Sequence, residues 1–453
     1  MKNKLFIAIL LLFIPVLAHA QISLEQKIGQ LIMVGFNNIG SSFDTIKVDL
    51  AQRNLGAVIL YGHNLDNPTQ MKNLTDELNS YSELPLMIAT DQEGGRVSRL
   101  NSGNGFASTY SAAQLGSFNT ETHTRTSAKT MAGWLNSVGI NVNLAPVADV
   151  NVNPLSPAIG KLNRSFSSDP AEVTKHVAWY ADEFHQAHII TSLKHFPGHG
   201  SAVIDSHLGF TDISTTWKEY ELDPFRDLIA NGYSDMIMTG HLFKDNWDSN
   251  YPVSISEFAI QKILRDSLNF SGVVITDELF MKAISDNYGL DEAIILALKA
   301  VTDILLFYGN LYEDNSITRH VIELVMSKIN SGDLDESVIN AAYERVQALK
   351  TKRLSTVSID EFISEIPNDL RLLAYPNPFN PSTTIQAMIP QEGNYQIEVY
   401  SILGQKVATL HNGYLSSGNH SFNFDGNRLS SGMYLVVINS GSQRITMKIT
   451  LAK

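Results

Sequence analysis

Short apolar segments alternate with amphipathic segments through most of this chain, and that alternation narrows the folds open to it. Eight apolar runs rich in β-branched residues cover 31–36, 57–61, 86–90, 140–146, 189–193, 235–239, 272–276 and 303–307. Between them, helical spacing of apolar residues covers 68–81, 122–138, 170–187, 256–268 and 289–300. Strands that alternate with helices predict a parallel sheet.

The number of strand–helix units favours one parallel architecture. Eight units within residues 22–354 match the size and strand count of a (β/α)8 barrel. We therefore expect an α/β fold with a TIM-type barrel over this range. A doubly wound sheet is the alternative.

The two ends of the chain differ from this pattern. Residues 1–20 combine early lysines, an apolar run and a final Ala-His-Ala, which is typical of a secretory signal peptide. A membrane anchor is the alternative, but the run is shorter than the ~20 apolar residues that a span needs. Residues 355–371 are polar and acidic, and predict a linker. Residues 372–453 predict a small all-β sandwich, with short alternating strands at 395–400, 406–411, 418–424, 432–439 and 444–451.

Composition excludes several classes of function. The formal net charge of −13 disfavours an electrostatic grip on nucleic acid or on an anionic membrane. The chain contains no cysteine, which excludes disulfides, thiolate metal sites and a cysteine nucleophile. We expect no nucleic-acid partner and no transmembrane segment, and no sequence feature indicates an oligomeric state.

Polar side chains follow several predicted strands where each strand ends. Asp91 follows the third run, Lys194 and His195 the fifth, His241 the sixth and Asp277 the seventh. The carboxyl ends of barrel strands meet at one face, where the active sites of such barrels are built. The sequence therefore predicts a polar pocket at that face.

The stretch KHFPGHGSAVIDSH, residues 194–207, holds the densest group of reactive side chains. In it, Asp205 and His207 are separated by one residue, so both can point the same way from an extended segment. A carboxylate beside an imidazole fixes the tautomer and stabilises the imidazolium, as a general acid/base requires. A surface loop with a chance Asp-x-His is the alternative.

Asp277 lies in GVVITDELFM, directly after an apolar run. A carboxylate held at the end of a buried strand can serve as nucleophile, base or metal ligand. The alternative is the N-cap of a following helix.

A set of charged and polar residues is expected to bind substrate. Carboxylates accept hydrogen bonds from sugar hydroxyls, and arginine forks onto amide or carboxylate oxygens. Glu93 is a second carboxylate near Asp91, which we expect to orient its neighbours. The predicted binding residues are Asp91, Arg99, Arg164, Lys194 and His195.

A metal site is the main mechanistic alternative. Its ligands would come from His195, His199, His207, His241 and Asp277. Metal-dependent barrel hydrolases usually carry His-x-His at the end of the first strand, whereas this chain reads Val34-Gly35-Phe36-Asn37 there. We therefore expect no metal and no other cofactor.

Taken together, these motifs resemble the bacterial β-N-acetylglucosaminidases of glycoside hydrolase family 3. The matching segments, in order, are DQEGGRV, LAPVADVN, RSFSSDP, KHFPGHG with DSH, and VVITDEL, spread over residues 22–354. The resemblance implies a (β/α)8 barrel, a retaining mechanism and no metal. No second α/β sandwich domain follows the barrel region, which favours the single-domain hexosaminidase branch over the β-glucosidases.

The resemblance also assigns roles to residues. Asp277 matches the nucleophile, His207 the acid/base on a mobile loop, and Asp205 its partner. The five predicted binding residues match those that hold the N-acetylglucosamine unit. The chain departs from the family pattern before Arg164, where Ile159 and Gly160 are followed by three extra residues.

The C-terminal segment resembles the sorting domain of the type IX secretion system. The matching residues are YPNPFNPSTTI, VYSILGQKV and the final SSGMYLVVINSGSQRITMKITLAK. A carbohydrate-binding sandwich is the alternative. The resemblance implies export by the type IX machinery to the cell surface or the medium.

These features predict an exported, exo-acting, retaining β-N-acetylhexosaminidase that acts on N-acetylglucosamine-containing glycans such as chitin oligosaccharides or peptidoglycan fragments. A β-glucosidase or a glycoside phosphorylase on the same barrel is the first alternative, since an uncharged histidine base would not repel phosphate. A metal-dependent barrel hydrolase and a non-catalytic surface protein are the others.

Overall fold

The protein divides into two compact units, residues 1–354 and residues 355–453, in a computed structural model. The structure describes residues 22–206, 209–313, 315–354, 370–375, 379–402, 404–441 and 444–451. The predicted signal peptide and nearly all of the predicted linker lie outside these residues, so both remain predictions. Each unit is described by itself.

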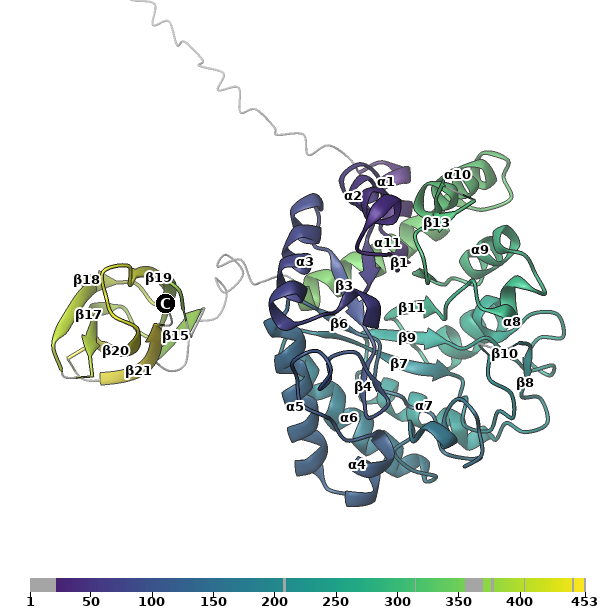
Figure 1. Ribbon diagram of the computed structural model, residues 1–453, viewed down its shortest axis with the longest axis horizontal. Coiled ribbons are helices and arrows are strands. Elements are labelled where there is room, and N and C mark those ends of the chain that lie inside the picture. The colour runs from purple at the N-terminus through teal and green to yellow at the C-terminus, as the bar shows by residue number, and fades with distance from the viewer. Residues whose placement is uncertain are drawn as a thin grey trace, which may run out of the picture. The chain divides into compact units, whose positions relative to one another are not determined.

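Eight parallel strands form a single sheet in the first unit, and this confirms the predicted barrel (Figure 1). Each strand pairs with its neighbour in the chain order of the barrel, and β12 returns to pair with β1. A bridge between Ile275 and Ile304 joins the last two strands and nearly closes the ring. The strands are β1 (Ile32–Val34), β2 (Ala57–Ile59), β3 (Met87–Thr90), β6 (Val142–Asn143), β7 (Ile190–Phe196), β9 (Met236–Thr239), β11 (Val273–Thr276) and β12 (Leu305–Phe307).

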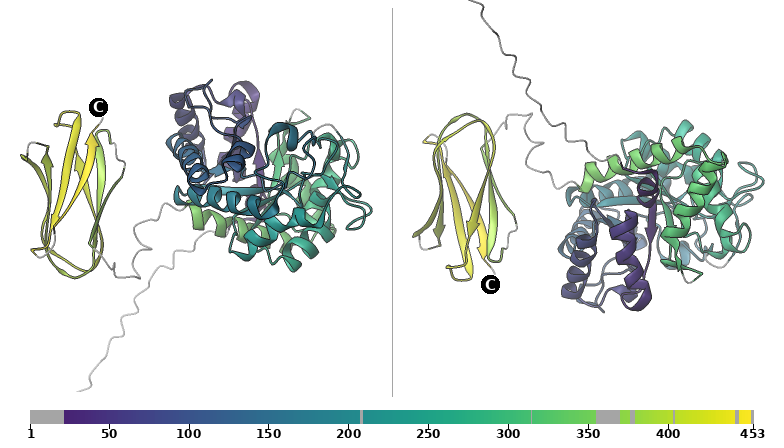
Figure 2. Two further views of the ribbon diagram at one scale, coloured as in Figure 1. Left: turned by 90° about the horizontal axis from the view of Figure 1, so that it is seen from below. Right: turned by 90° about the horizontal axis from the view of Figure 1, so that it is seen from above.

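Helices surround this sheet, and their starts follow local capping chemistry (Figures 1 and 2). The Asn67 side chain caps α3 with Pro68 at its first position, and Asp169 with Pro170 does the same for α6. The helices are α1 (Leu24–Gly29), α2 (Gly40–Arg53), α3 (Pro68–Tyr81), α4 (Ala112–Phe118), α5 (Glu121–Ser137), α6 (Pro170–Gln186), α7 (Asp223–Ala230), η5 (Phe258–Ser267), α8 (Lys282–Ser285), α9 (Leu290–Lys299), α10 (Ile317–Asn330) and α11 (Glu336–Leu354).

Short elements decorate the connections between the barrel strands. Three two-stranded pairs are β4 (Gln92–Gly94) with β5 (Val97–Ser98), β8 (Thr211–Asp212) with β10 (Leu242–Phe243), and β13 (Leu311–Tyr312) with β14 (Asn315–Ser316). The short 3-10 turns are η1 (Gly62–Asn64), η2 (Gly160–Leu162), η3 (Glu219–Leu222) and η4 (Val253–Ile255). The β4–β5 hairpin lies directly after β3 and therefore at the carboxyl face of the barrel.

One local prediction was wrong, and one predicted helix is present with a different hydrogen-bonding pattern. The fifth strand does not end at Leu193: β7 runs on to Phe196, so Lys194 and His195 lie within the strand rather than after it. The Lys194 ammonium is buried there because its ion pairs compensate for lost solvation, and the buried His195 ring contacts the Asp149 carboxylate at 2.7 Å. The helix predicted at 256–268 has π-type hydrogen bonding in η5.

Hydrogen bonds from arginine and lysine side chains of α11 join this helix to the amino-terminal face of the barrel. Arg353 Nε donates to both carboxylate oxygens of Asp235, at 3.0 and 3.1 Å. Arg345 Nε reaches Asp303 Oδ1 at 2.8 Å. Lys350 Nζ donates to Gln30 Oε1 at 2.8 Å and to the Gly56 carbonyl at 3.0 Å. These contacts lie at the starts of the strands and hold the last helix of the barrel in place.

The second unit is a β-sandwich of two antiparallel sheets, as predicted, and Figure 2 shows the two layers face to face. Its core contains the buried side chains of Ile385, Ile397, Val436 and Ile449. The structure adds two strands, β15 and β16, to the five predicted ones. One sheet has the order β15 (Arg371–Tyr375), β16 (Ser382–Ile389), β19 (Gly418–Asp425), and the other β18 (Lys406–Leu415), β17 (Gly393–Ser401), β20 (Gly432–Asn439), β21 (Arg444–Leu451).

None of the helices in the described parts of the chain is both long and apolar enough to cross a bilayer.

Replacing Lys350 with methionine is expected to change how stability depends on pH. Burial lowers the pKa of Lys350 to about 7. Between that value and its ordinary pKa, the unfolded chain binds a proton that the folded chain does not, so stability rises with pH across this window. The free energy of unfolding of the wild type relative to Lys350→Met should therefore rise from pH 7 to pH 10, by up to roughly 1.4 kcal/mol per pKa unit.

Chemical denaturation at several pH values measures this difference. Lys129→Met, at an exposed lysine, serves as the matched control and should give a flat difference. If the free energies of unfolding of Lys350→Met and of the wild type differ by the same amount at every pH, the prediction is contradicted.

Candidate active site

The described polar residues gather at the carboxyl face of the barrel. Asp91 follows β3, Asp149 lies in the segment after β6, and Asp277 follows β11. Lys194 and His195 come from the last part of β7. Five side chains from four strands thus meet at the face where active sites of this fold are built.

Five charged side chains form one connected ion-pair cluster, the site cluster. Lys194 Nζ lies 2.8 Å from Asp91 Oδ1 and 2.7 Å from Glu93 Oε1. Arg164 donates two hydrogen bonds to Glu93, at 2.9 and 2.8 Å. Arg99 Nη2 donates to Asp91 Oδ2 at 3.1 Å. Ion pairs therefore join four of the five predicted binding residues, with Glu93 at their centre, and the fifth, His195, lies 3.4 Å from Arg164.

The cations outweigh the effect of burial on these carboxylates. Burial alone would raise the pKa of Asp91, but the ammonium of Lys194 and the guanidinium of Arg99 hold it below its usual value. Burial would likewise raise the pKa of Glu93, which Arg164 and Lys194 instead lower. Both acids are therefore charged at neutral pH, and the cluster presents three cations and two carboxylates to a ligand.

Asp149 is a site residue that sequence reasoning missed. Its Oδ2 lies 2.7 Å from His195 Nδ1, and its Oδ1 accepts from the backbone N–H groups of His195 and His199 at 3.1 and 2.8 Å. A charged carboxylate at Nδ1 fixes the proton there. His195 then turns Nε2 toward Arg164 Nη2, at 3.4 Å. The signal that could have found Asp149 is its place in LAPVADVN, within a buried segment after a strand.

The extra residues before Arg164 form a compact turn. Gly160–Leu162 make the 3-10 turn η2, and Asn163 adopts a left-handed conformation with φ of 57°. The Arg164 backbone N–H then donates to the Ile159 carbonyl at 3.2 Å. Because this turn brings the chain back on itself, the longer loop still delivers Arg164 to the site cluster.

Asp277 is held rigidly at the end of β11. Its backbone N–H donates to the Thr239 carbonyl at 3.0 Å, and its Oδ1 accepts from the Glu278 N–H at 2.9 Å. The side chain is 9% exposed, so it is largely but not fully buried. The following helix α8 has Met281 at its N-cap and no side-chain cap. The alternative that Asp277 caps this helix is therefore wrong.

Tyr61 connects the site cluster with Asp277. Burial raises the pKa of Tyr61, and the nearby carboxylates of Asp91, Glu278 and Asp277 raise it further. Its ring packs against that of Tyr308, with centroids 4.9 Å apart. The absence of a side chain at Gly35 makes room for both, since a Cβ there would lie 2.0 Å from the Tyr308 carbonyl oxygen and 2.7 Å from Tyr61 Cε2.

A buried glutamate, Glu221, holds the segment that follows β7 in place. Glu221 Oε2 accepts from the Ser201 N–H at 3.1 Å, and Oε1 accepts from the Lys218 N–H at 2.9 Å. Burial raises the pKa of Glu221 to about 7. A Cβ at Gly198, where φ is 122°, would lie 2.7 Å from Glu221 Cβ, so this loop needs glycine to approach the glutamate.

The same segment leads to the predicted acid/base pair. His199 Nε2 contacts Ser206 Oγ at 3.2 Å, directly beside Asp205. Burial lowers the pKa of His199 to about 4, and the nearby His195 adds to this, so its ring is neutral at physiological pH. Asp205 is half-buried. His207 lies outside the described residues, so its pairing with Asp205 remains a prediction.

His241 supports the backbone around Asp277. Its Nε2 donates to the Glu278 carbonyl at 2.8 Å, and its Nδ1 lies 2.6 Å from Ser254 Oγ. Within the described ranges, no three His, Asp or Glu side chains form a group that could hold a metal ion. His207, one of the proposed metal ligands, lies outside the described residues.

The first unit matches the family model described as the "Glycosyl hydrolase family 3 N terminal domain" over residues 23–349. The chain belongs to glycosyl hydrolase family 3. Residues 373–452 match the "Secretion system C-terminal sorting domain". Both family assignments predicted from sequence motifs are confirmed.

Several relatives carry hexosaminidase names. The chain is 30% identical to "Beta-hexosaminidase A" of Pseudoalteromonas piscicida over 74% of its own length and 62% of that protein. It is 31% identical to "Beta-hexosaminidase LpqI" of Mycobacterium tuberculosis over 73% of its length and 84% of that protein. The chain thus spans less than two thirds of the Pseudoalteromonas relative.

Solved structures show the same fold. A family 3 β-N-acetylglucosaminidase from Paenibacillus sp. str. FPU-7 superposes with a TM-score of 0.69 and 32% identity, covering 74% of this chain and 63% of that one. A β-N-acetylhexosaminidase from Beutenbergia cavernae gives a TM-score of 0.67 and 28% identity, covering 73% of this chain and 99% of that one.

Replacing Glu93 with glutamine is expected to destabilise the first unit strongly. The change leaves the buried cations of Lys194 and Arg164 without their shared carboxylate. Removing one partner of a buried ion pair typically costs about 3–5 kcal/mol. Urea denaturation, monitored through a signal that reports on the first unit, measures the loss in its free energy of unfolding.

Glu323→Gln is the matched control, because Glu323 forms an exposed ion pair with Arg319 on α10. It should change the free energy of unfolding by less than about 0.5 kcal/mol. Equal stability of the two variants would show that the site cluster does not stabilise the barrel.

Proposed function

We propose that this protein is an exported, exo-acting, retaining β-N-acetylhexosaminidase that releases terminal N-acetylglucosamine from chitin oligosaccharides or peptidoglycan fragments. The observation that carries the proposal is Asp277, a carboxylate fixed at the end of β11 beside Tyr61 and the site cluster. The names of the relatives support the substrate class.

Asp277 acts as the nucleophile in this proposal. Its carboxylate attacks the anomeric carbon while His207 gives a proton to the leaving oxygen, which releases the rest of the glycan and forms a glycosyl-aspartate. His207, now neutral, takes a proton from water, and the resulting attack frees the sugar and restores the Asp277 carboxylate. Asp205 orients the imidazole and stabilises its charged form.

The site cluster binds the N-acetylglucosamine unit. The charged oxygens of Asp91 accept hydrogen bonds from sugar hydroxyls. Arg99, Arg164 and Lys194 donate to hydroxyl or amide oxygens, and Asp149 orients His195 toward the same unit. Because the ion pairs fix these groups before substrate arrives, little ordering remains to be done on binding.

The C-terminal sandwich directs export. The match of residues 373–452 to a secretion sorting domain supports passage through the type IX machinery, with the protein released or held at the cell surface. The predicted signal peptide would carry the chain to the periplasm first.

The purified protein should cleave 4-nitrophenyl N-acetyl-β-glucosaminide at least tenfold faster, by kcat/KM, than the corresponding glucoside. The added N-acetyl group gives the cations of the site cluster a further oxygen to bind. Assays with and without phosphate distinguish hydrolysis from phosphorolysis. Faster cleavage of the glucoside, or a requirement for phosphate with a sugar phosphate as product, would replace the proposal with one of these alternatives.

The proposed roles of Asp277 and His207 predict different losses. Asp277→Ala should lower kcat more than 1,000-fold on every substrate, because no glycosyl-enzyme forms. His207→Ala should retain activity on substrates with an activated leaving group and regain rate with azide, which replaces water at the second step. Mass spectrometry with a 2-fluoro or 5-fluoro sugar locates the trapped ester. A label on a residue other than Asp277 would contradict the assignment.

A further inference from the structure

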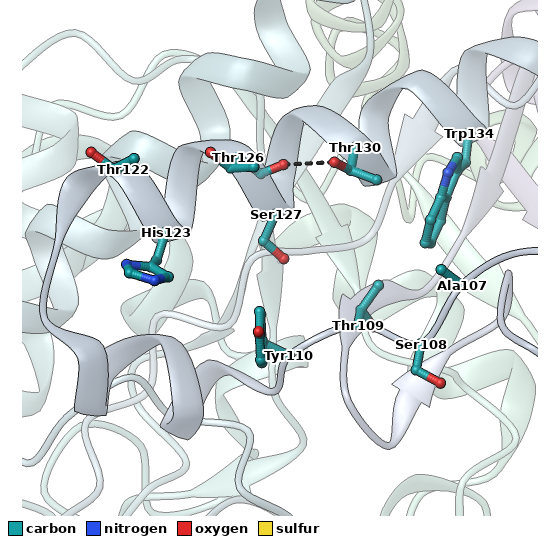
Figure 3. A pocket seen from close by; sticks show the side chains of 10 residues that line it. All are labelled: Ala107, Ser108, Thr109, Tyr110, Thr122, His123, Thr126, Ser127, Thr130 and Trp134. Atoms are coloured by element: carbon teal, nitrogen blue, oxygen red, sulfur yellow. Dashed lines mark hydrogen bonds between the residues drawn. The ribbon is translucent and has the colours of Figure 1, made fainter.

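A groove of about 370 Å³ runs along the outer side of α5, apart from the residues of the active site (Figure 3). The opposite wall is the segment of residues 107–110. Its volume falls in the range of small-molecule sites, about 300–1,000 Å³. We call it the α5 groove, and its lining residues are Ala107, Ser108, Thr109, Tyr110, Thr122, His123, Thr126, Ser127, Thr130 and Trp134.

Hydroxyl groups dominate the polar lining. Thr122, Thr126 and Thr130 are spaced four residues apart, so they form a row along one face of α5, as Figure 3 shows. Hydroxyls can both donate and accept hydrogen bonds. None of the ten lining residues is Asp, Glu, Lys or Arg.

Two aromatic rings border this row of hydroxyls. Tyr110 is 47% exposed, and its ring meets that of Phe118 edge to face at 5.1 Å. Figure 3 shows Trp134 at one end of the groove and Tyr110 nearer its middle, and the Trp134 ring lies 5.3 Å from that of Phe106. Because neighbouring rings hold them in place, both present apolar surface at little entropic cost on binding.

We infer that the α5 groove binds a neutral oligosaccharide chain. A sugar ring offers apolar C–H faces to aromatic side chains and a rim of hydroxyls that pair with threonine and serine. An anionic ligand would need a cation, and no lysine or arginine lines the groove. Arg125 on the same helix is paired with Glu121 at 2.6 Å and with Asp182 and Glu183 at 3.0 Å, and the His123 ring in the lining contacts Thr120 Oγ1 at 2.6 Å.

The 107–110 wall of the groove packs against Gly94 and Gly95, and no residue of the site cluster lines the groove. Thr109 Oγ1 accepts from the Gly95 N–H at 3.1 Å, and a Cβ at Gly94 would lie 2.4 Å from the Tyr110 carbonyl oxygen. Gly94 ends β4, the strand that carries Glu93. A glycan held in the groove would thus be kept close to the face where the site cluster lies. The choice of a chitin-type glycan rests on the proposed function.

Affinity electrophoresis of the full chain in gels containing soluble glycol chitin tests this inference. Asp277→Asn is used as the background so that the polymer is not cleaved. Adding Tyr110→Ala or Trp134→Ala should weaken retention at least fivefold, and Thr126→Val at least twofold. Tyr414→Ala, which removes a tyrosine that is 61% exposed in the sandwich, is the matched control and should leave retention unchanged.

Turnover of 4-nitrophenyl N-acetyl-β-glucosaminide provides the second readout. With Asp277 intact, Tyr110→Ala and Thr126→Val should keep this activity within twofold, because neither touches the site cluster. Retention that is equal in all variants would overturn the inference, even if the small substrate is cleaved. Retention that depends on Tyr110 would support the groove even if the small substrate is not cleaved, which separates this inference from the proposed function.

Sedimentation of the same variants tests whether a second copy of the chain, rather than a glycan, occupies the groove. A wild-type dimer that Tyr110→Ala converts to monomers would show that a second copy of the chain fills the groove, and would also overturn the inference.

Discussion

The charge balance around Lys194 is the constraint on which the rest of the site depends. This ammonium is buried within a strand and lies between two carboxylates, Asp91 and Glu93, each of which a guanidinium holds on its other side. A buried lysine without such partners would lose its proton or disrupt the strand. The cluster therefore ties the segments after β3 and β6 to β7, and it fixes the relative positions of these side chains.

Charged residues at the two faces of the barrel serve different purposes. At the amino-terminal face, Asp235 and Asp303 are fully buried; Asp303 binds Arg265 and Arg345, and Asp235 binds Arg353. At the carboxyl face, the side chains of Asp91 and Arg99 keep 15% and 28% exposure. The first arrangement joins the helices to the sheet, whereas the second leaves polar atoms partly exposed to solvent. The position of a charge along a strand thus separates structural from functional roles better than its identity does.

The sequence predicted most of the fold, because buried strands leave a direct signal as apolar runs. All eight barrel strands lie within or overlap their predicted runs. The prediction failed where tertiary contacts override composition. Lys194 and His195 were placed after their strand because charged residues are poor core material, and only ion pairs from other strands make their burial stable. The strands β15 and β16 were missed because they flank a segment dense in proline and asparagine. Asp149 was missed because its imidazole partner comes from a different strand.

The contacts of α11 define where the barrel is complete as a folding unit. Lys350, Arg353 and the buried Asp235 lie within or against its final turns. A shortened chain that stopped before Arg353 would leave the Asp235 carboxylate with fewer cations and open the base of the sheet to water. Proteolytic removal of the sorting domain must therefore cut beyond this residue if the released enzyme is to stay folded.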